Sequence, residues 1–275
     1  MAQCCAEGFE HSGTPVGKVI KIGNIPTYYS RAKITSTSST SVTSDDSYSS
    51  RVLVIATDVF GYELVNVRLV ADRYAALGTF DVYIPDLHNG DSLKAETYDS
   101  ILLKQTGFWN SLVGNLKFTA SIPSLISWFS KHNEKVSTPI VDNFLYALKS
   151  ERPLITKVGA IGYCWGGKFA ILAGGKLAKQ RSTTINNQTL TPSVDCVIAC
   201  HPSLLTLPAD IENITVPTFF GLAETDHVFS KQDVARTQSI LRKKGNLTVL
   251  AYDNTTSILE NNTNSNTASA SSSSS

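Results

Sequence analysis

Cys164 is the residue whose type and surroundings point most directly to chemistry. Gly162 lies two residues before it, Gly166 two residues after it, and an apolar strand-like run precedes the motif. A nucleophile on a sharp strand-to-helix turn requires small neighbours at these spacings, because its own backbone is strained. A helix that begins directly after the cysteine favours the thiolate through its partial positive charge. The motif predicts a cysteine nucleophile with the Trp165 amide as one oxyanion donor; the alternative is a buried structural thiol.

Alternating strand and helix patterns surround this motif. Apolar runs rich in β-branched residues predict strands, and apolar residues at helical spacing predict the segments between them. The predicted strands are 51–57, 80–85, 157–163, 194–199, 216–221 and 247–252; the predicted helices are 64–77, 168–178 and 230–244, with a helix-prone region over 98–130. Repeated strand–helix units predict an α/β fold, with a mostly parallel sheet covered by helices on both faces.

Composition excludes several classes of function. The 275 residues are 42% hydrophobic and carry a net charge of +1, which indicates one large globular domain without an electrostatic footprint for nucleic acid. No apolar run is long enough to span a membrane, and the first residues lack the pattern of a signal peptide. Five scattered cysteines and single histidines predict neither a disulfide framework nor a metal site, and no cofactor is expected. We expect a cytoplasmic protein, with a nuclear pool left open.

Two segments differ in composition from the rest of the chain. Residues 35–50 are dominated by Ser and Thr, and residues 254–275 by Asn, Thr, Ser and Ala. Neither can bury enough apolar surface to offset its ordering entropy. We therefore expect a single domain over 1–253, with a flexible surface insertion at 35–50 and a disordered tail at 254–275.

The elbow Gly-Tyr-Cys164-Trp-Gly-Gly-Lys resembles that of the dienelactone hydrolases (carboxymethylenebutenolidases), in particular their fungal branch. The runs 57–61 and 82–87 and the N-terminal run Cys4-Cys-Ala-Glu-Gly-Phe also resemble segments of that family. The resemblance covers roughly residues 4–30 and 51–252. It implies an α/β-hydrolase fold, a small ester or lactone as substrate, a monomeric enzyme, and a covalent acyl-enzyme on the cysteine.

The same resemblance implies roles for three further residues. The family's triad acid, which orients the histidine, maps onto Asp226, with Glu224 as a local competitor. A family glutamate that activates the thiol is replaced here by Asp58, which is one methylene shorter; the alternative for Asp58 is a turn former at the strand end. The neighbouring Val59 amide would be the second oxyanion donor.

The histidine of the triad departs from the family pattern. The family carries it after the last strand, in a segment similar to Gly-x-x-His-Gly-Phe, whereas the resemblance here ends at about Asp253 and no histidine follows His227. His201, His227 and His88 are the candidate replacements. We expect a hydrolase; the alternatives are a catalytically incompetent hydrolase-fold binding protein, or a truncated or frameshifted family member with an incomplete C-terminal part.

Overall fold

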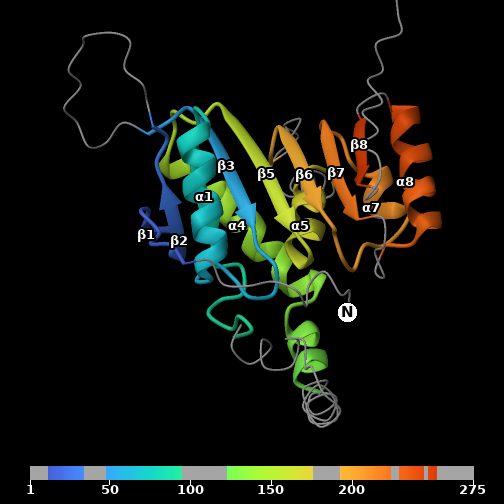
Figure 1. Ribbon diagram of the computed structural model, residues 1–275, viewed down its shortest axis with the longest axis horizontal. Coiled ribbons are helices and arrows are strands. Elements are labelled where there is room, and N and C mark those ends of the chain that lie inside the picture. Colours follow the sequence, from blue (N-terminus) through green and yellow to red (C-terminus); the bar gives the residue numbers. More distant parts are fainter. Residues whose placement is uncertain are drawn as a thin grey trace, which may run out of the picture.

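The structure of the protein is a computed structural model that describes residues 12–33, 48–94, 123–175, 193–223, 229–244 and 247–252. Its described strands form one eight-stranded sheet in the order β1-β2-β4-β3-β5-β6-β7-β8 (Figure 1). The strands from β4 to β8 along this order are parallel, and β1 and β2 join one edge as an antiparallel pair. The predicted mostly parallel sheet is therefore confirmed.

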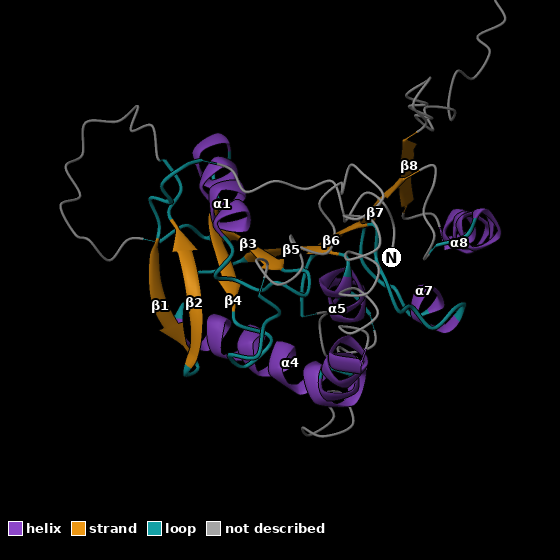
Figure 2. Ribbon diagram, turned by 60° about the horizontal axis from the view of Figure 1, so that its bottom comes forward, coloured by secondary structure: helices purple, strands orange, loops and turns teal. Residues whose placement is uncertain are grey.

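Helices cover both faces of this sheet. The strands are β1 (Lys18–Ile22), β2 (Ile25–Ser30), β3 (Arg51–Ala56), β4 (Asp81–Pro85), β5 (Lys157–Tyr163), β6 (Cys196–Cys200), β7 (Thr218–Ala223) and β8 (Leu247–Tyr252). The helices are α1 (Val65–Leu77), α4 (Glu134–Glu151), α5 (Trp165–Ala173), α7 (Ala209–Glu212) and α8 (Lys231–Lys244). Figure 2 shows α1 on one face of the sheet, with α4, α5 and α8 on the other.

Alternate side chains of the central strands supply two separate cores. Val54 of β3 packs into the core under α4 and α5, whereas its neighbour Ile55 packs into the core under α1. Because both faces are covered, the central strands are apolar throughout, as expected of a parallel sheet. The sheet therefore presents β3, β5, β6 and β7 side by side, with their carboxyl ends at one edge.

The expected strands agree with the observed ones to within two residues at their ends. The helix predicted over 168–178 begins earlier, at Trp165, and ends at Ala173, where Gly174 caps it. Neither α4 nor the β1–β2 hairpin was predicted. Of the flexible insertion expected at 35–50, residues 35–47 lie outside the described residues, and so does the whole tail expected to be disordered, 254–275. The helix-prone region 98–130 is described only from residue 123 on, where 123–131 is helical.

Candidate active site

Cys164 lies between the end of β5 and the first residue of α5. Its backbone dihedrals are φ 49° and ψ −114°, so that it is one of the few described residues other than glycine with a positive φ. This conformation is costly for a residue with a side chain and persists only where the surrounding structure enforces it. The sharp strand-to-helix turn predicted from the sequence is therefore present, with the cysteine at its apex.

The glycines on either side of Cys164 are required by close backbone approach. A Cβ atom on Gly162 would lie 2.4 Å from the carbonyl oxygen of Gly166, and a Cβ on Gly166 would lie 2.2 Å from the carbonyl oxygen of Ala56. Real Cβ atoms do not approach backbone oxygen so closely, and a backbone neighbour cannot rotate away. The elbow thus packs directly on β3, and the predicted need for small residues at both positions is confirmed.

Hydrogen bonds attach the elbow to the end of β6. The Cys164 amide donates to the Cys200 carbonyl (3.1 Å), and the Ser203 amide donates to the Cys164 carbonyl (3.0 Å). The Ser203 Oγ also lies 3.7 Å from the Cys164 Sγ, within hydrogen-bonding distance for sulfur. Ser203 is not among the site residues predicted from the sequence. Its position just after a strand, three residues beyond Cys200, was the available signal.

Asp58 lies at the same edge, two residues after the end of β3. Its carboxylate accepts the Phe60 amide at 2.9 Å, so it forms the strand-end turn given above as the alternative to thiol activation. Burial raises the pKa of the Asp58 carboxyl, while the hydrogen bond from Phe60 and the charge of His201 lower it. Its predicted role in activating the thiol stays a prediction.

His201 directly follows β6 and lies on the other side of the elbow from Asp58. Its backbone has φ 36°, and its amide donates to the Gly221 carbonyl of β7 at 2.8 Å. In the sheet order β3-β5-β6, with Tyr163 paired to Cys200, Asp58 and His201 flank Cys164. They are close enough for the imidazolium charge to act on the Asp58 carboxylate. The other described candidate, His88, follows β4 and packs against Trp165, whereas His201 follows the strand that pairs with the end of β5.

The two predicted oxyanion donors are also at this edge. Trp165 is the first residue of α5, so its amide belongs to the first turn, where amides lack an acceptor within the helix. Its indole is buried and donates to the His132 carbonyl at 3.1 Å, which fixes the start of the helix. Val59 follows Asp58, and its carbonyl accepts the Leu93 amide at 2.9 Å. That both amides point at a substrate oxygen stays a prediction.

His88 is a packing residue. Its side chain is fully buried, its ring centroid lies 4.6 Å from that of Trp165, and its Nδ1 lies 3.1 Å from the Ser92 Oγ. Burial, with a smaller contribution from the neighbouring His132, lowers the pKa of His88 to about 3. His88 is consequently neutral at physiological pH, and its pKa is far below that needed for a general base.

The remaining predicted site residues follow β7. Asp226 and its competitor Glu224, together with His227, lie outside the described residues, because the description of β7 ends at Ala223. The predicted role of Asp226 therefore stays a prediction.

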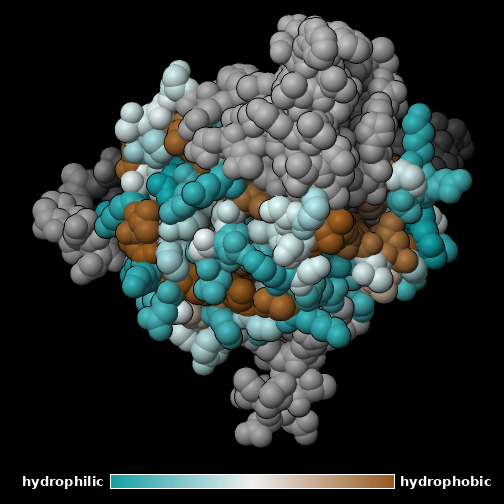
Figure 3. Space-filling view, turned by 90° about the horizontal axis from the view of Figure 1, so that it is seen from below, coloured by the Kyte–Doolittle hydropathy of each residue, from teal (hydrophilic) through white to brown (hydrophobic). Residues whose placement is uncertain are grey.

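A groove of about 360 Å³ opens beside Ser203 between the loop after β6 and the start of α8. Five apolar side chains and one carboxylate line it: Pro202, Leu204, Leu205, Leu207, Phe229 and Asp233. Figure 3 looks onto the carboxyl edge of the sheet and shows apolar patches among hydrophilic side chains there. The lining of the groove includes none of the predicted site residues, but Pro202 and Leu204 flank Ser203 in the chain.

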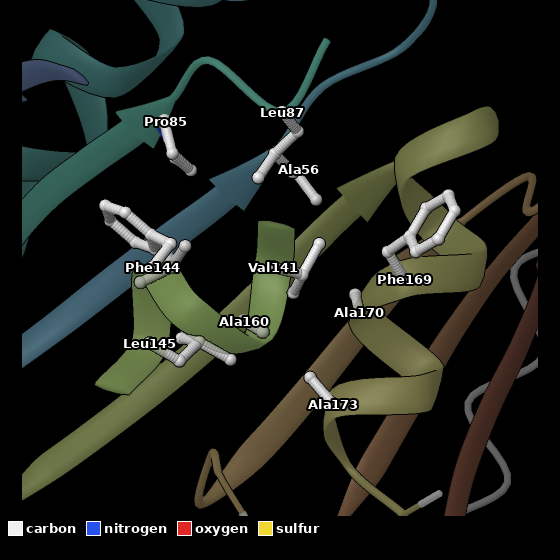
Figure 4. A pocket seen from close by; sticks show the side chains of 11 residues that line it. Ala56, Pro85, Leu87, Val141, Phe144, Leu145, Ala160, Phe169, Ala170 and Ala173 are labelled. Atoms are coloured by element: carbon white, nitrogen blue, oxygen red, sulfur yellow. The ribbon is translucent and has the colours of Figure 1, made fainter. Parts of the chain in front are cut away.

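A second hollow, of about 20 Å³, lies inside the core between the sheet, α4 and α5 (Figure 4). Its lining is apolar and includes Val54, Phe144 and Phe169. The volume is about that of one water, and an apolar void of this size stays dry. We regard it as a packing defect.

Comparisons with known proteins agree with this fold. A sequence model of the dienelactone hydrolase family matches residues 39–273. The chain is 26% identical over 242 residues to "Hydrolase pyvD" of Aspergillus violaceofuscus, covering 87% of this chain and 77% of that protein. It is 24% identical over 246 residues to "Dienlactone hydrolase 1" of Gibberella moniliformis, covering 88% and 76%. Its fold is similar to that of a dienelactone hydrolase-like promiscuous phosphotriesterase from metagenomic libraries, with a TM-score of 0.55 at 16% identity over 87% of this chain and 82% of that one.

Neither a membrane-spanning helix nor a metal site is found in the part of the chain that the structure describes. No helix there is long and apolar enough to cross a membrane. The same residues contain no cluster of three His, Cys, Asp or Glu side chains that could hold a metal ion.

Proposed function

This chain belongs to the dienelactone hydrolase family, and from that premise we propose that it hydrolyses a small ester or lactone through an acyl-enzyme on Cys164. The single observation that carries the proposal is the strained backbone of Cys164, with φ 49° and ψ −114° at a strand-to-helix turn. A strained backbone conformation lowers the stability of the fold, and such conformations cluster at functional sites. A buried structural thiol would not need it.

The proposed reaction has two steps. The Cys164 thiolate attacks the carbonyl carbon of the substrate, while the amides of Val59 and Trp165 stabilise the tetrahedral oxyanion. The C–O bond then breaks, the alcohol leaves with a proton given up by the protonated general base, and a thioester remains on the sulfur. A water molecule, deprotonated by a general base, attacks the thioester and releases the acid product and the thiolate.

We assign the general base to His201. It flanks Cys164 from β6, and Asp58 on the opposite side is close enough to feel its charge. Asp226 follows the neighbouring strand β7 and is proposed to orient the imidazole. Of the described residues, this edge of the sheet carries the proposed nucleophile, a histidine and the Asp58 carboxyl, and the chain has no histidine after His227.

The groove beside Ser203 supports a small, mainly apolar acyl or alcohol group in the substrate. Its volume of about 360 Å³ and its lining of Leu and Phe side chains suit a ligand of that size. Asp233 at its rim disfavours a substrate that carries a negative charge at that point.

The time course of product release from an activated aryl ester tests this proposal. We expect a burst of about one equivalent of the aryl alcohol per enzyme, followed by sustained turnover as the thioester is hydrolysed. A burst without turnover would mean that the elbow works and the base does not. Absence of both burst and turnover would reject the proposal in favour of the alternative, a hydrolase-fold protein that binds its small molecule without cleaving it.

Replacement of the proposed base should slow hydrolysis of the acyl-enzyme. Asn and Gly both tolerate the positive φ of His201, so His201→Asn and His201→Gly remove the imidazole without adding backbone strain. We expect the steady-state rate of either variant to fall about 10²-fold, the usual contribution of a general base. Added imidazole should partly restore turnover in His201→Gly. Full activity in both variants would show that the base lies elsewhere.

A further inference from the structure

We propose that Ser203 is a catalytic residue: its hydroxyl donates a hydrogen bond to the Cys164 sulfur and stabilises negative charge on that atom. The proposal rests on the proposed function in taking Cys164 as the nucleophile. It adds a second group that acts directly on the reacting sulfur.

Ser203 contacts Cys164 through its side chain and through its backbone amide. Its Oγ lies 3.7 Å from the Cys164 Sγ, and its amide donates to the Cys164 carbonyl at 3.0 Å. The residue is only 8% exposed, so few water molecules compete for the hydroxyl. The hydrogen bond from this hydroxyl is weak when the sulfur is a neutral thiol and stronger when it is a thiolate, because hydrogen bonds to charged groups are stronger than those between neutral groups.

A buried ion cluster holds the loop that carries Ser203. The Lys168 ammonium, in the first half of α5, donates to the Leu204 carbonyl at 2.7 Å and pairs with the Glu134 carboxylate at 3.0 Å. The Asp210 carboxylate lies 3.9 Å from the same ammonium. These contacts fix the residue next to Ser203 against α5, the helix that follows Cys164. The hydroxyl is therefore positioned before substrate binds, as preorganised catalysis requires.

The hydroxyl can act at two stages of the reaction. In the resting enzyme its O–H donates to the thiolate and raises the fraction of ionised thiol at neutral pH. When water attacks the thioester, the C–S bond breaks and its electron pair returns to sulfur; the same O–H then donates to the departing thiolate. No proton is transferred from Ser203 at either stage, so atoms and electrons balance without a further reagent.

Other titratable groups lie on the elements packed against Cys164. Asp58 follows β3, Cys200 and His201 lie at the end of β6, and Lys168 lies on α5, neutralised by its carboxylate partners. A change at Ser203 leaves these groups in place. Its effect on the pH dependence of the thiol is therefore separable from theirs.

The test is the rate at which iodoacetamide alkylates Cys164 as a function of pH, followed by mass spectrometry of the Cys164 peptide. In Ser203→Ala we expect the thiol pKa to rise, so that alkylation at pH 7 slows about tenfold while the plateau rate at high pH stays the same. Ser203→Thr keeps the hydroxyl and should restore the wild-type profile. Ser203→Gly, a second variant without the hydroxyl, should behave as Ser203→Ala does.

Ser137→Ala is the matched control. Ser137 is also buried, but its Oγ has no hydrogen-bond partner in the described structure and it lies on α4. We expect this variant to keep the wild-type profile. A wild-type profile in both Ser203→Ala and Ser203→Gly would overturn the proposal, even where the ester burst on Cys164 persists. Loss of the burst in the wild-type protein would instead reject the proposed function, and the alkylation profile distinguishes the two failures.

Discussion

Replacement of Cys164 by Ala should lower the rate of ester hydrolysis about 10³-fold or more and abolish the burst of aryl alcohol. Ala has the same Cβ atom as Cys, so the backbone strain at the elbow is unchanged. It has no atom that can attack a carbonyl carbon. Any remaining rate would come from the oxyanion donors and substrate binding alone. The measurement is product release from the activated aryl ester, in the burst and in the steady state.

Cys200→Ala is the control for this prediction. Cys200 lies at the end of β6, next to the elbow, and burial raises the pKa of its thiol, so it should remain protonated and unreactive. We expect this variant to hydrolyse the ester as the wild-type protein does. Equal loss in both variants would indicate that the substitutions disturb the edge of the sheet, and undiminished turnover in Cys164→Ala would refute the nucleophile.

Replacement of Gly166 by Ala should destabilise the fold by about 3 kcal/mol, at the upper end of the usual cost of overpacking. The new Cβ would lie 2.2 Å from the Ala56 carbonyl oxygen and 2.4 Å from the Thr57 carbonyl oxygen. Both are backbone atoms at the end of β3, so relief requires α5 to move away from the sheet. Ala gains about 1 kcal/mol over Gly in helix propensity, which is too little to compensate. The free energy of unfolding in urea measures the effect.

Gly159→Ala is the matched control on β5. A Cβ there would lie 3.4 Å from the nearest atoms, the Cys196 Sγ and a Leu53 methyl group, which is ordinary van der Waals contact. We expect its free energy of unfolding to differ from wild type by less than about 1 kcal/mol. If Gly166→Ala were as stable as Gly159→Ala, the elbow would not pack on β3 as described.

Local sequence patterns predicted those parts of the fold that depend on neighbouring residues. The strand 157–163, the glycines around Cys164 and the helix predicted over 230–244 all have a local cause, and the structure contains each of them. The Ser230 hydroxyl, just before that helix, accepts the Asp233 amide at 3.2 Å. The β1–β2 hairpin was not predicted, although Gly23 and Asn24 between its strands are residue types that favour a hairpin turn. Both have positive φ in the structure. Helix α4 was missed because Pro139 interrupts its pattern.

The contacts of the candidate site depend on the order of strands in the sheet, which the order of strands along the chain does not give. β5 pairs with β3 rather than with β4, the strand before it along the chain, and this brings Asp58 to the edge beside the elbow. The pairing of β5 with β6 brings His201 and Ser203 to the other side of Cys164. Burial likewise decides the role of His88, which the sequence alone left among the candidate bases. The role of Asp58 could not be decided from the sequence either, because the hydrogen bond from the Phe60 amide to its carboxylate depends on the turn that the chain adopts.

The most direct test of the account is to find the acyl group on the protein. The wild-type chain would be mixed with an activated acetate ester, quenched in acid within the burst, digested, and its peptides analysed by mass spectrometry. The account predicts one acetyl group on the peptide that contains Cys164, and none there in the Cys164→Ala variant. An acetyl group that is absent from Cys164 while the ester is being hydrolysed would contradict it.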